Sequence, residues 1–135
     1  MIVKDVPFAS FIGIKDNKDE LSLDFKDELQ NHVKTIHASA QFTLAETKSG
    51  LYLLELFPEL EGKVIPLSRE ATIKYKKPAT EKILAFASIE EASIEKFKTT
   101  FDKKGRGSIS VKIQIKDIND ILCSEGEFSW FIQAL

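Results

Sequence analysis

Cysteine and histidine are scarce in this chain, and a long apolar run is missing. Its 135 residues include one cysteine, Cys123, so no intramolecular disulfide can form, which fits a reducing compartment such as the cytoplasm. Two dispersed histidines and one cysteine do not make a recognised ligand set, so we expect no metal site. The first residues show neither the apolar length of a membrane span nor a convincing secretory leader. The sequence therefore predicts a cytoplasmic chain that does not engage a membrane.

A large excess of charge of either sign is also absent. The formal net charge is −2 and the sequence pI is about 5.7, so the chain has no strong field that would attract nucleic acid or an anionic membrane. The length is near the commonest domain size, and no linker, repeat or low-complexity tract interrupts it. We therefore expect a single domain over residues 1–135 and no nucleic-acid partner.

A single acid lies on the otherwise uncharged side of the most apolar helix that the sequence predicts. Residues 31–50 read NHVKTIHASAQFTLAETKSG, a turn followed by a helix that Pro58 and Gly62 bring to an end. At about 100° per residue, Gln41, Lys48 and Glu55 share one azimuth and are expected to be solvated. Glu46 points to the other side. Its predicted neighbours there are small or apolar: Ser39, Phe42, Thr43, Ser49, Gly50 and Leu53.

This position predicts that Glu46 is at least partly buried. A carboxylate that loses hydration without gaining a partner is a better proton acceptor than a solvated one. The plainer interpretation, a surface or ion-paired glutamate, stays open from position alone because many helix acids lean out to water.

Alternation of apolar residues predicts strands around this helix. One strand covers Leu21–Phe25, and four more follow the helix at Val64–Lys77, Ile83–Ile89, Ser108–Lys116 and Ile121–Phe131. Pro78 and Ala79 are expected to break a hairpin. A short helix at Pro7–Gly13, an amphipathic helix through Ile94 and Phe101, and a flexible segment Lys103–Gly107 complete the prediction. These elements indicate an α+β fold in which a curved antiparallel sheet surrounds a long helix.

The central segment resembles the hotdog-fold thioesterases. In that family the central helix typically starts with a His-Gly-Gly turn and carries an Asp or Glu nine positions after the His, which is the spacing of His37 and Glu46. Asn31 precedes the turn as the family's Asn does, and KYKKPA at residues 74–79 resembles the end of its following strand. The resemblance covers nearly the whole chain and implies the hotdog fold, a curved antiparallel sheet wrapped around a long central helix.

Two departures accompany this resemblance. The two glycines of the turn are Ala38 and Ser39 here, and the acid is Glu where many relatives of the phenylacetate-pathway type have Asp. The likeness is nearest to an uncharacterised thioesterase-like branch. It implies an acyl-CoA thioesterase in which the Ala38 N–H donates to the oxyanion and Glu46 acts as general base or as nucleophile. It implies no cofactor apart from coenzyme A as part of the substrate, and a homodimer with the pocket across its interface; pairing of dimers into tetramers stays open.

Other residues of the segment have two interpretations each. Asn31 binds the attacking water or the substrate carbonyl, or it only stabilises the turn through its amide. His37 fits a capping or packing role better than proton transfer, and Ser39 fits a first-turn position better than direct catalysis. His37 and Ser39, with Phe42 and Thr43 beside Glu46, are the expected substrate-binding residues on the helix.

Cations at a strand end and near a Gly-rich connection are candidates for the phosphates of coenzyme A. Lys77 and Arg106 are chosen from a larger set, although ordinary solvated charge explains them as well. A non-catalytic acyl or acyl-CoA binding protein is the alternative function, because the turn is altered. Hydratase chemistry is disfavoured, since that related class commonly has a His five residues after the helix acid, where this chain has Leu51.

Overall fold

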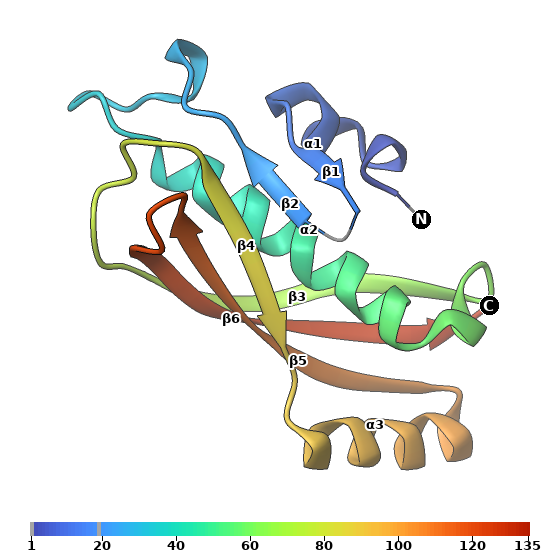
Figure 1. Cartoon of the computed structure of the whole chain (residues 1–135). Helices are drawn as coiled ribbons and strands as arrows, with labels where there is room; N and C mark the ends of the chain where they lie inside the picture. The colour runs from blue at the N-terminus through green and yellow to red at the C-terminus, as the bar shows by residue number, and fades with distance from the viewer. Residues whose placement is uncertain (1, 19) are drawn as a thin grey trace.

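The structure, a computed structural model, describes residues 2–18 and 20–135. Within these residues the helices are α1 (Pro7–Ile12), α2 (Ala38–Leu56) and α3 (Glu91–Lys104), with single-turn 3-10 helices at Val3–Asp5, Asp27–Leu29 and Pro58–Leu60. The strands are β1 (Lys15–Asn17), β2 (Glu20–Leu23), β3 (Val64–Tyr75), β4 (Ile83–Ser88), β5 (Arg106–Asp117) and β6 (Leu122–Ala134). They form one six-stranded antiparallel sheet in the order β1-β2-β4-β5-β6-β3 (Figure 1).

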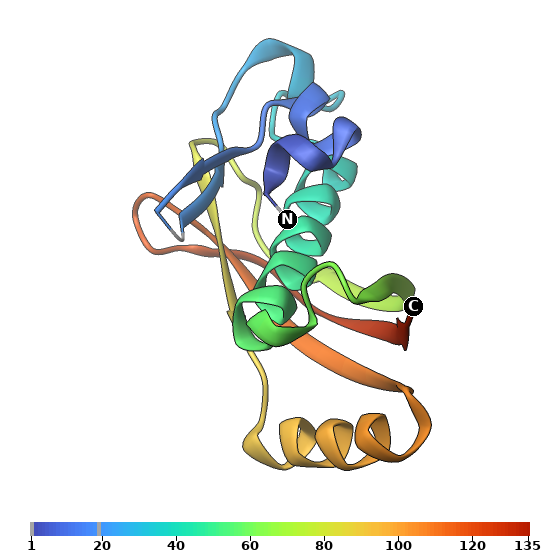
Figure 2. The same cartoon turned by 90° about the vertical axis from the view of Figure 1, so that its right-hand side faces the viewer.

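The sheet curls around α2, so that β4 and β3 lie on different sides of this helix (Figures 1 and 2). Helix α2 ends at Leu56 because Pro58 cannot continue it. Its block Leu51–Leu54 is almost entirely buried, as expected for a helix that is covered on several sides. The predicted α+β fold, with a curved antiparallel sheet around a long central helix, is confirmed.

Strand β5 shows why the sheet has one dry face and one wet face. Its inward residues Ile109, Val111, Ile113 and Ile115 are buried against α2, and the alternate residues carry the lysines and polar groups. Cys123 at the start of β6 is also buried, and burial raises the pKa of its thiol. The thiol is therefore neutral near pH 7 and packs as a small apolar group.

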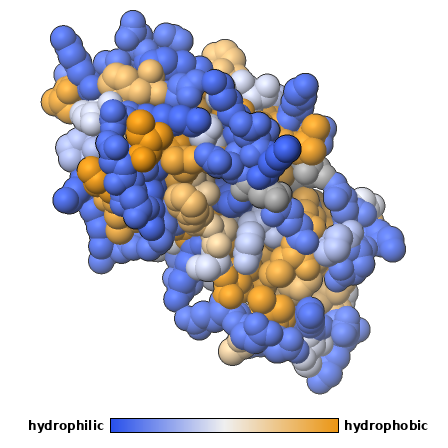
Figure 3. All heavy atoms as spheres, viewed as in Figure 1, coloured by the Kyte–Doolittle hydropathy of each residue, from blue (hydrophilic) through white to orange (hydrophobic). Residues whose placement is uncertain are grey.

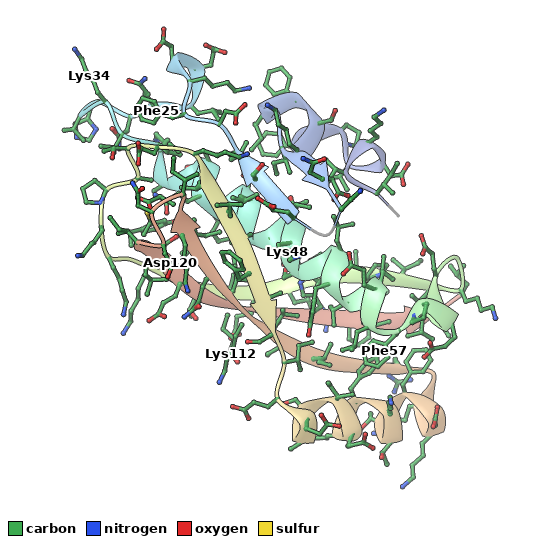
Figure 4. The ribbon with its side chains drawn as sticks, in the orientation of Figure 1. Phe25, Lys34, Lys48, Phe57, Lys112 and Asp120 are labelled. Carbon is green, nitrogen blue, oxygen red and sulfur yellow. The ribbon has the colours of Figure 1, made fainter. Side chains whose placement is uncertain are left out.

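Helix α1 packs against α2, and helix α3 packs mainly on β5. Figure 2 shows α1 beside the N-terminal half of α2 and α3 near its C-terminal end. Phe57, labelled in Figure 4, follows α2 and packs on Phe97 of α3 with ring centroids 5.2 Å apart. On the face shown in Figure 3, apolar atoms gather between α3 and the rest of the molecule, while hydrophilic atoms cover its outer side. Helix α3 is therefore the amphipathic cover that the sequence predicts.

Two local predictions are wrong. Lys103–Gly107 is not a flexible segment, because α3 continues to Lys104, Gly105 ends it with a φ of 68°, and β5 begins at Arg106. Only this left-handed cap is needed to turn the chain from helix to strand, and glycine adopts it without strain. Pro78 and Ala79 do not form a hairpin, since β3 pairs with β6 whereas β4 pairs with β2 and β5. They belong to a connection that passes from one edge strand to the middle of the sheet.

Across residues 2–18 and 20–135, none of the helices combines the length and the apolar character that crossing a membrane would need.

Candidate functional site

The N-terminus of α2 leaves one backbone donor without an acceptor. His37 is the N-cap, and its Nδ1 accepts a hydrogen bond of 2.9 Å from the Ser39 N–H. The His37 carbonyl accepts from the N–H groups of Ala40 and Gln41. The Ala38 N–H has no acceptor among the described residues. The N–H of Ser39 is therefore engaged, whereas that of Ala38, the predicted oxyanion donor, remains available at the positive end of the helix.

Asn31 holds together the turn that leads into α2. Its Oδ1 accepts from the N–H groups of Val33 and Thr35, each at 3.0 Å, and its Nδ2 donates to Thr35 Oγ1 at 2.8 Å. Lys34, labelled at the tip of this turn in Figure 4, has a φ of 63°. The structure therefore shows that Asn31 stabilises the turn, and a direct role of Asn31 in catalysis stays a prediction.

Glu46 lies half-buried two turns farther along α2. On one flank, Phe42 packs edge-on against Phe128 of β6, with ring centroids 5.2 Å apart. On the other flank, Ser39 and Thr43 line a hollow beside α1. The carboxylate of Glu46 makes no ion pair or side-chain hydrogen bond with any described residue. The prediction of partial burial among apolar and small neighbours is confirmed.

The backbone of Glu46 is tied to the sheet through a serine. Ser49 Oγ donates to the Glu46 carbonyl at 2.7 Å and accepts from Trp130 Nε1 of β6 at 2.8 Å. Gly50 permits this close approach, because a Cβ there would lie 2.9 Å from the Trp130 ring. The middle of α2, and with it Glu46, is therefore fixed against β6.

The side of α2 that was expected to be solvated is covered. Gln41 and Lys48 are only 4% and 8% exposed, whereas Glu55, the third residue on this side of the helix, is exposed. Figure 4 shows Lys48 midway along α2, and this residue lines a hollow with β4. The prediction for Gln41 and Lys48 is wrong because it assumes that a helix packs on one side, whereas the curled sheet encloses this one.

Two hollows flank the start of α2 and divide six of the predicted site residues between them, whereas Glu46, Phe42 and Arg106 line neither of these two. A hollow of about 300 Å³ is lined by Asn31, Ala38 and Lys77 together with Gln41 and Tyr75. A second hollow of about 280 Å³ is lined by His37, Ser39 and Thr43 with Phe8 and Ile12 of α1. The helix start itself separates the two hollows.

The two predicted phosphate-binding cations do not converge within one chain. Lys77 donates its backbone N–H to the Cys123 carbonyl near the start of β6, whereas Arg106 pairs with Gln133 near its end. Strand β5, which runs along β6 between these two points, is about 36 Å long at about 3.3 Å per residue. Lys77 lies at the hollow that contains Ala38, and Arg106 lies at the opposite end of the sheet.

Tyr75 belongs to this site although the sequence analysis did not select it. It ends β3, and its Oη donates to the Ala38 carbonyl at 3.1 Å. Burial raises the pKa of the phenol, so the O–H is protonated and donates at neutral pH. Tyr75 is 46% exposed and lies at the rim of the hollow, and only the fold shows that its side chain reaches α2.

Tyr75→Phe is expected to lower the free energy of unfolding by about 0.5–1 kcal/mol, the usual net value of one neutral hydrogen bond. Because the folded-state pKa of Tyr75 is raised, its contribution is complete below the ordinary value of 10.0 and is lost as pH rises through the folded-state value. Urea unfolding of both proteins at pH 7 and in alkaline buffer measures this difference. Equal stabilities at pH 7 would show that the Tyr75–Ala38 hydrogen bond does not anchor the helix.

The chain is similar to known proteins in family and in fold. It matches the family described as "Domain of unknown function (DUF4442)" over residues 9–132. No curated protein matches it in sequence. Solved structures that share its fold include the following three. The first is a Pseudomonas aeruginosa protein of unknown function described as a probable thioesterase, with 18% identity, a TM-score of 0.79, and coverage of 98% of this chain and 90% of the other. The second is a Bacillus halodurans protein solved with CoA, with 21% identity, a TM-score of 0.72, and coverage of 93% of this chain and 74% of the other. The third is a variant of a Staphylococcus aureus thioesterase, with 18% identity, a TM-score of 0.72, and coverage of 95% of this chain and 99% of the other.

At these identities the likenesses establish a shared fold, and the predicted resemblance to the hotdog-fold thioesterase superfamily is confirmed at that level. The family match covers most of the sequence. The chain therefore has the hotdog fold and belongs to the DUF4442 family.

Proposed function

We propose that this protein is a cytoplasmic acyl-CoA thioesterase, in which Glu46 activates the hydrolytic water and the Ala38 N–H binds the oxygen that becomes negative. The observation that carries the proposal is the arrangement on α2. One helix presents an N–H at its positive end and a half-buried carboxylate two turns farther along, and neither group has a partner among residues 2–18 and 20–135. Thioester hydrolysis requires a proton acceptor for water and a donor for the oxyanion, and these two groups supply them.

The described activities of the structural relatives support this proposal. The Pseudomonas aeruginosa protein is described as a probable thioesterase and the Staphylococcus aureus protein as a thioesterase enzyme, and the Bacillus halodurans protein was solved with CoA. Two structures of the Staphylococcus aureus protein carry alanine in place of a glutamine and of a glutamate, at positions fifteen residues apart. Asn31 and Glu46 are also fifteen residues apart in this chain. A glutamine and a glutamate of that protein thus have the same spacing as Asn31 and Glu46 here.

The spacing on α2 favours the general-base route over direct attack by Glu46. Eight residues separate Ala38 from Glu46, which is about 12 Å along the axis, shortened by the lean of the Glu46 side chain toward the N-terminus. A carbonyl group alone is too short to fill the gap between the Ala38 N–H and the Glu46 carboxylate, whereas a carbonyl with a water beside it can span most of this gap. Glu46 therefore takes a proton from water rather than attacking the carbonyl carbon itself.

The steps of the proposed reaction balance without a further reactant. Water forms a bond to the carbonyl carbon as Glu46 accepts one of its protons, and the π electrons of the carbonyl move onto its oxygen. The intermediate then re-forms the C=O bond and breaks the C–S bond. The departing thiolate takes the proton from Glu46, which releases a carboxylic acid and free coenzyme A. The proposed reaction uses no metal and no cofactor other than the coenzyme A part of the substrate.

The two hollows at the helix start suggest where the substrate parts bind. Phe8 and Ile12 of α1 give the hollow beside His37, Ser39 and Thr43 an apolar wall that suits an acyl group. Lys77 lies at the other hollow, where its ammonium group can meet a phosphate of coenzyme A. Arg106 lies too far along the sheet to join Lys77 within one subunit, so the proposal retains Lys77 alone.

The test of this function is thiol release from short, medium, long and aromatic acyl-CoAs, measured with a thiol reagent. Release of free thiol from at least one of these substrates is expected. Binding of acyl-CoA without thiol release would favour the second candidate, a non-catalytic acyl-CoA binding protein. The altered turn favours that candidate, because Ser39 uses its N–H on His37 and Asn31 uses its amide within its own turn.

The proposed enzyme is a homodimer that pairs through β3. This 12-residue strand is an edge of the sheet, and the outward residues Ile65 and Leu67 are about half exposed. A long, partly apolar edge is a template for pairing with a second strand. Antiparallel pairing of β3 with its copy around a two-fold axis would cover both edges at once.

Sedimentation equilibrium at micromolar concentration is expected to give a mass twice the 15.2 kDa of one chain. A mass of 15.2 kDa across this range would contradict the homodimer. A mass four times that of one chain would extend it to paired dimers.

A further inference from the structure

Gln41 is a buried polar side chain beside the free N–H of α2. It is only 4% exposed, and it lines the same hollow as Ala38 and Tyr75. Its Oε1 accepts a hydrogen bond of 2.7 Å from Ser124 Oγ of β6. The oxygen end of the amide is therefore satisfied inside the protein.

The nitrogen end of the same amide has no acceptor among the described residues. A carboxamide nitrogen carries two donor hydrogens. Among the described residues no fully buried side-chain nitrogen or oxygen lacks a partner, so the Gln41 nitrogen keeps contact with solvent. Because Ser124 holds the oxygen, the NH₂ group is left on the side of the hollow. The hollow is thus suited to a molecule that brings a hydrogen-bond acceptor.

The acceptor that fits best carries negative charge. Gln41 follows Ala38 by about one helical turn, and helical side chains lean back toward the N-terminus, so the amide extends over the turn that contains Ala38. Ala38, whose N–H has no acceptor among the described residues, lines the same hollow at the positive end of the helix dipole. Two N–H donors from different groups can therefore meet one oxygen atom there.

We propose that Gln41 is a catalytic residue, the second donor of the oxyanion hole. Its Nε2–H and the Ala38 N–H bind the carbonyl oxygen of the acyl thioester, and both hydrogen bonds strengthen as that oxygen becomes negative. Ser124 is a positioning residue, because it holds the amide in the orientation that directs the nitrogen to the substrate. This assignment rests on the proposed thioesterase function and names a group of the same site.

Gln41→Met tests the assignment, since methionine has a similar length and volume but lacks the amide. The substitution is expected to lower kcat for thiol release by about 10²- to 10³-fold, the usual loss for one oxyanion donor, with KM changed only a few-fold. Ser124→Ala keeps the amide but frees its orientation, so its loss should be clearly smaller. Gln133→Met, the same change at an exposed glutamine of β6, is the matched control and should keep the parent kcat.

The possible outcomes separate this inference from the proposed function. If the parent is active and Gln41→Met keeps its kcat, the role of Gln41 alone is overturned. A loss of kcat in Ser124→Ala as large as that in Gln41→Met would also overturn it, because it would indicate that Gln41 only packs against Ser124. A parent without any thiol release overturns the proposed function and this inference with it. If Gln41→Met does not fold, the double variant with Ser124→Ala removes both partners of the buried hydrogen bond, which proteins tolerate better. The double variant must show the same kcat loss.

Discussion

Glu46→Gln is expected to lower kcat for thiol release by about 10²- to 10⁴-fold, the range for loss of a general base. Glutamine keeps the shape of the side chain but cannot accept the proton of the attacking water. The fold should persist, because the Glu46 carboxylate makes no ion pair or side-chain hydrogen bond with the described residues, and its backbone carbonyl still accepts from Ser49. Steady-state thiol release and urea unfolding of both proteins measure the two effects.

Glu55→Gln is the matched control for this substitution. Glu55 lies on the same helix but is exposed, so kcat should stay within a few-fold of the parent value. A Glu46→Gln protein that folds and hydrolyses its substrate at the parent rate would reject Glu46 as the base. Equal losses in both variants would point to the net charge of the helix instead.

Ala38→Pro is expected to lower kcat by about 10²- to 10³-fold, because it deletes the proposed oxyanion donor and leaves the helix intact. Proline has no N–H, and it is favoured at the first position of a helix. The residue before it must be extended with ψ of about +120° to +160°, and His37 already has a ψ of 141°. Measurements of kcat and of the thermal midpoint therefore separate loss of the donor from loss of the fold.

The chain offers a close control at the start of α3. Glu91→Pro places proline at the first position of that helix, after Glu90 with a ψ of 140°, far from α2. This variant should keep both kcat and stability. If Ala38→Pro retains the parent kcat, the Ala38 N–H does not bind the oxyanion, and the donor set of the site must lie elsewhere.

The fold could be predicted from the sequence because its signals are local. Pro58 ends α2, the alternation of β5 selects its buried face, and the spacing of Phe97 and Phe101 gives the amphipathic α3. The nine-residue spacing of His37 and Glu46 placed the acid correctly on the helix relative to its cap. Each of these features depends on residues within a few turns of one another.

Apart from the Gly105 cap, which is a local feature, the errors arise where distant segments meet. Gln41 is buried because Ser124, 83 residues away, comes to lie over it on β6, and no local periodicity contains that information. The sequence likewise does not show that Tyr75 reaches the Ala38 carbonyl. Pro78 reads locally as a hairpin break, but the position of its neighbouring strands is decided by which edges of the sheet remain open. The resemblance indicates the Ala38 N–H, whereas the side chains of Gln41 and Tyr75 could be placed at the site only from the fold.

The most direct measurement is a crystal structure of the protein with a ketone analogue of an accepted acyl-CoA, in which a methylene group replaces the sulfur. The account predicts the ketone oxygen at about 2.7–3.1 Å from the Ala38 nitrogen, with a water between the carbonyl carbon and a Glu46 carboxylate. A ketone oxygen remote from every Ala38 N–H, with Glu46 directed into bulk solvent, would contradict it.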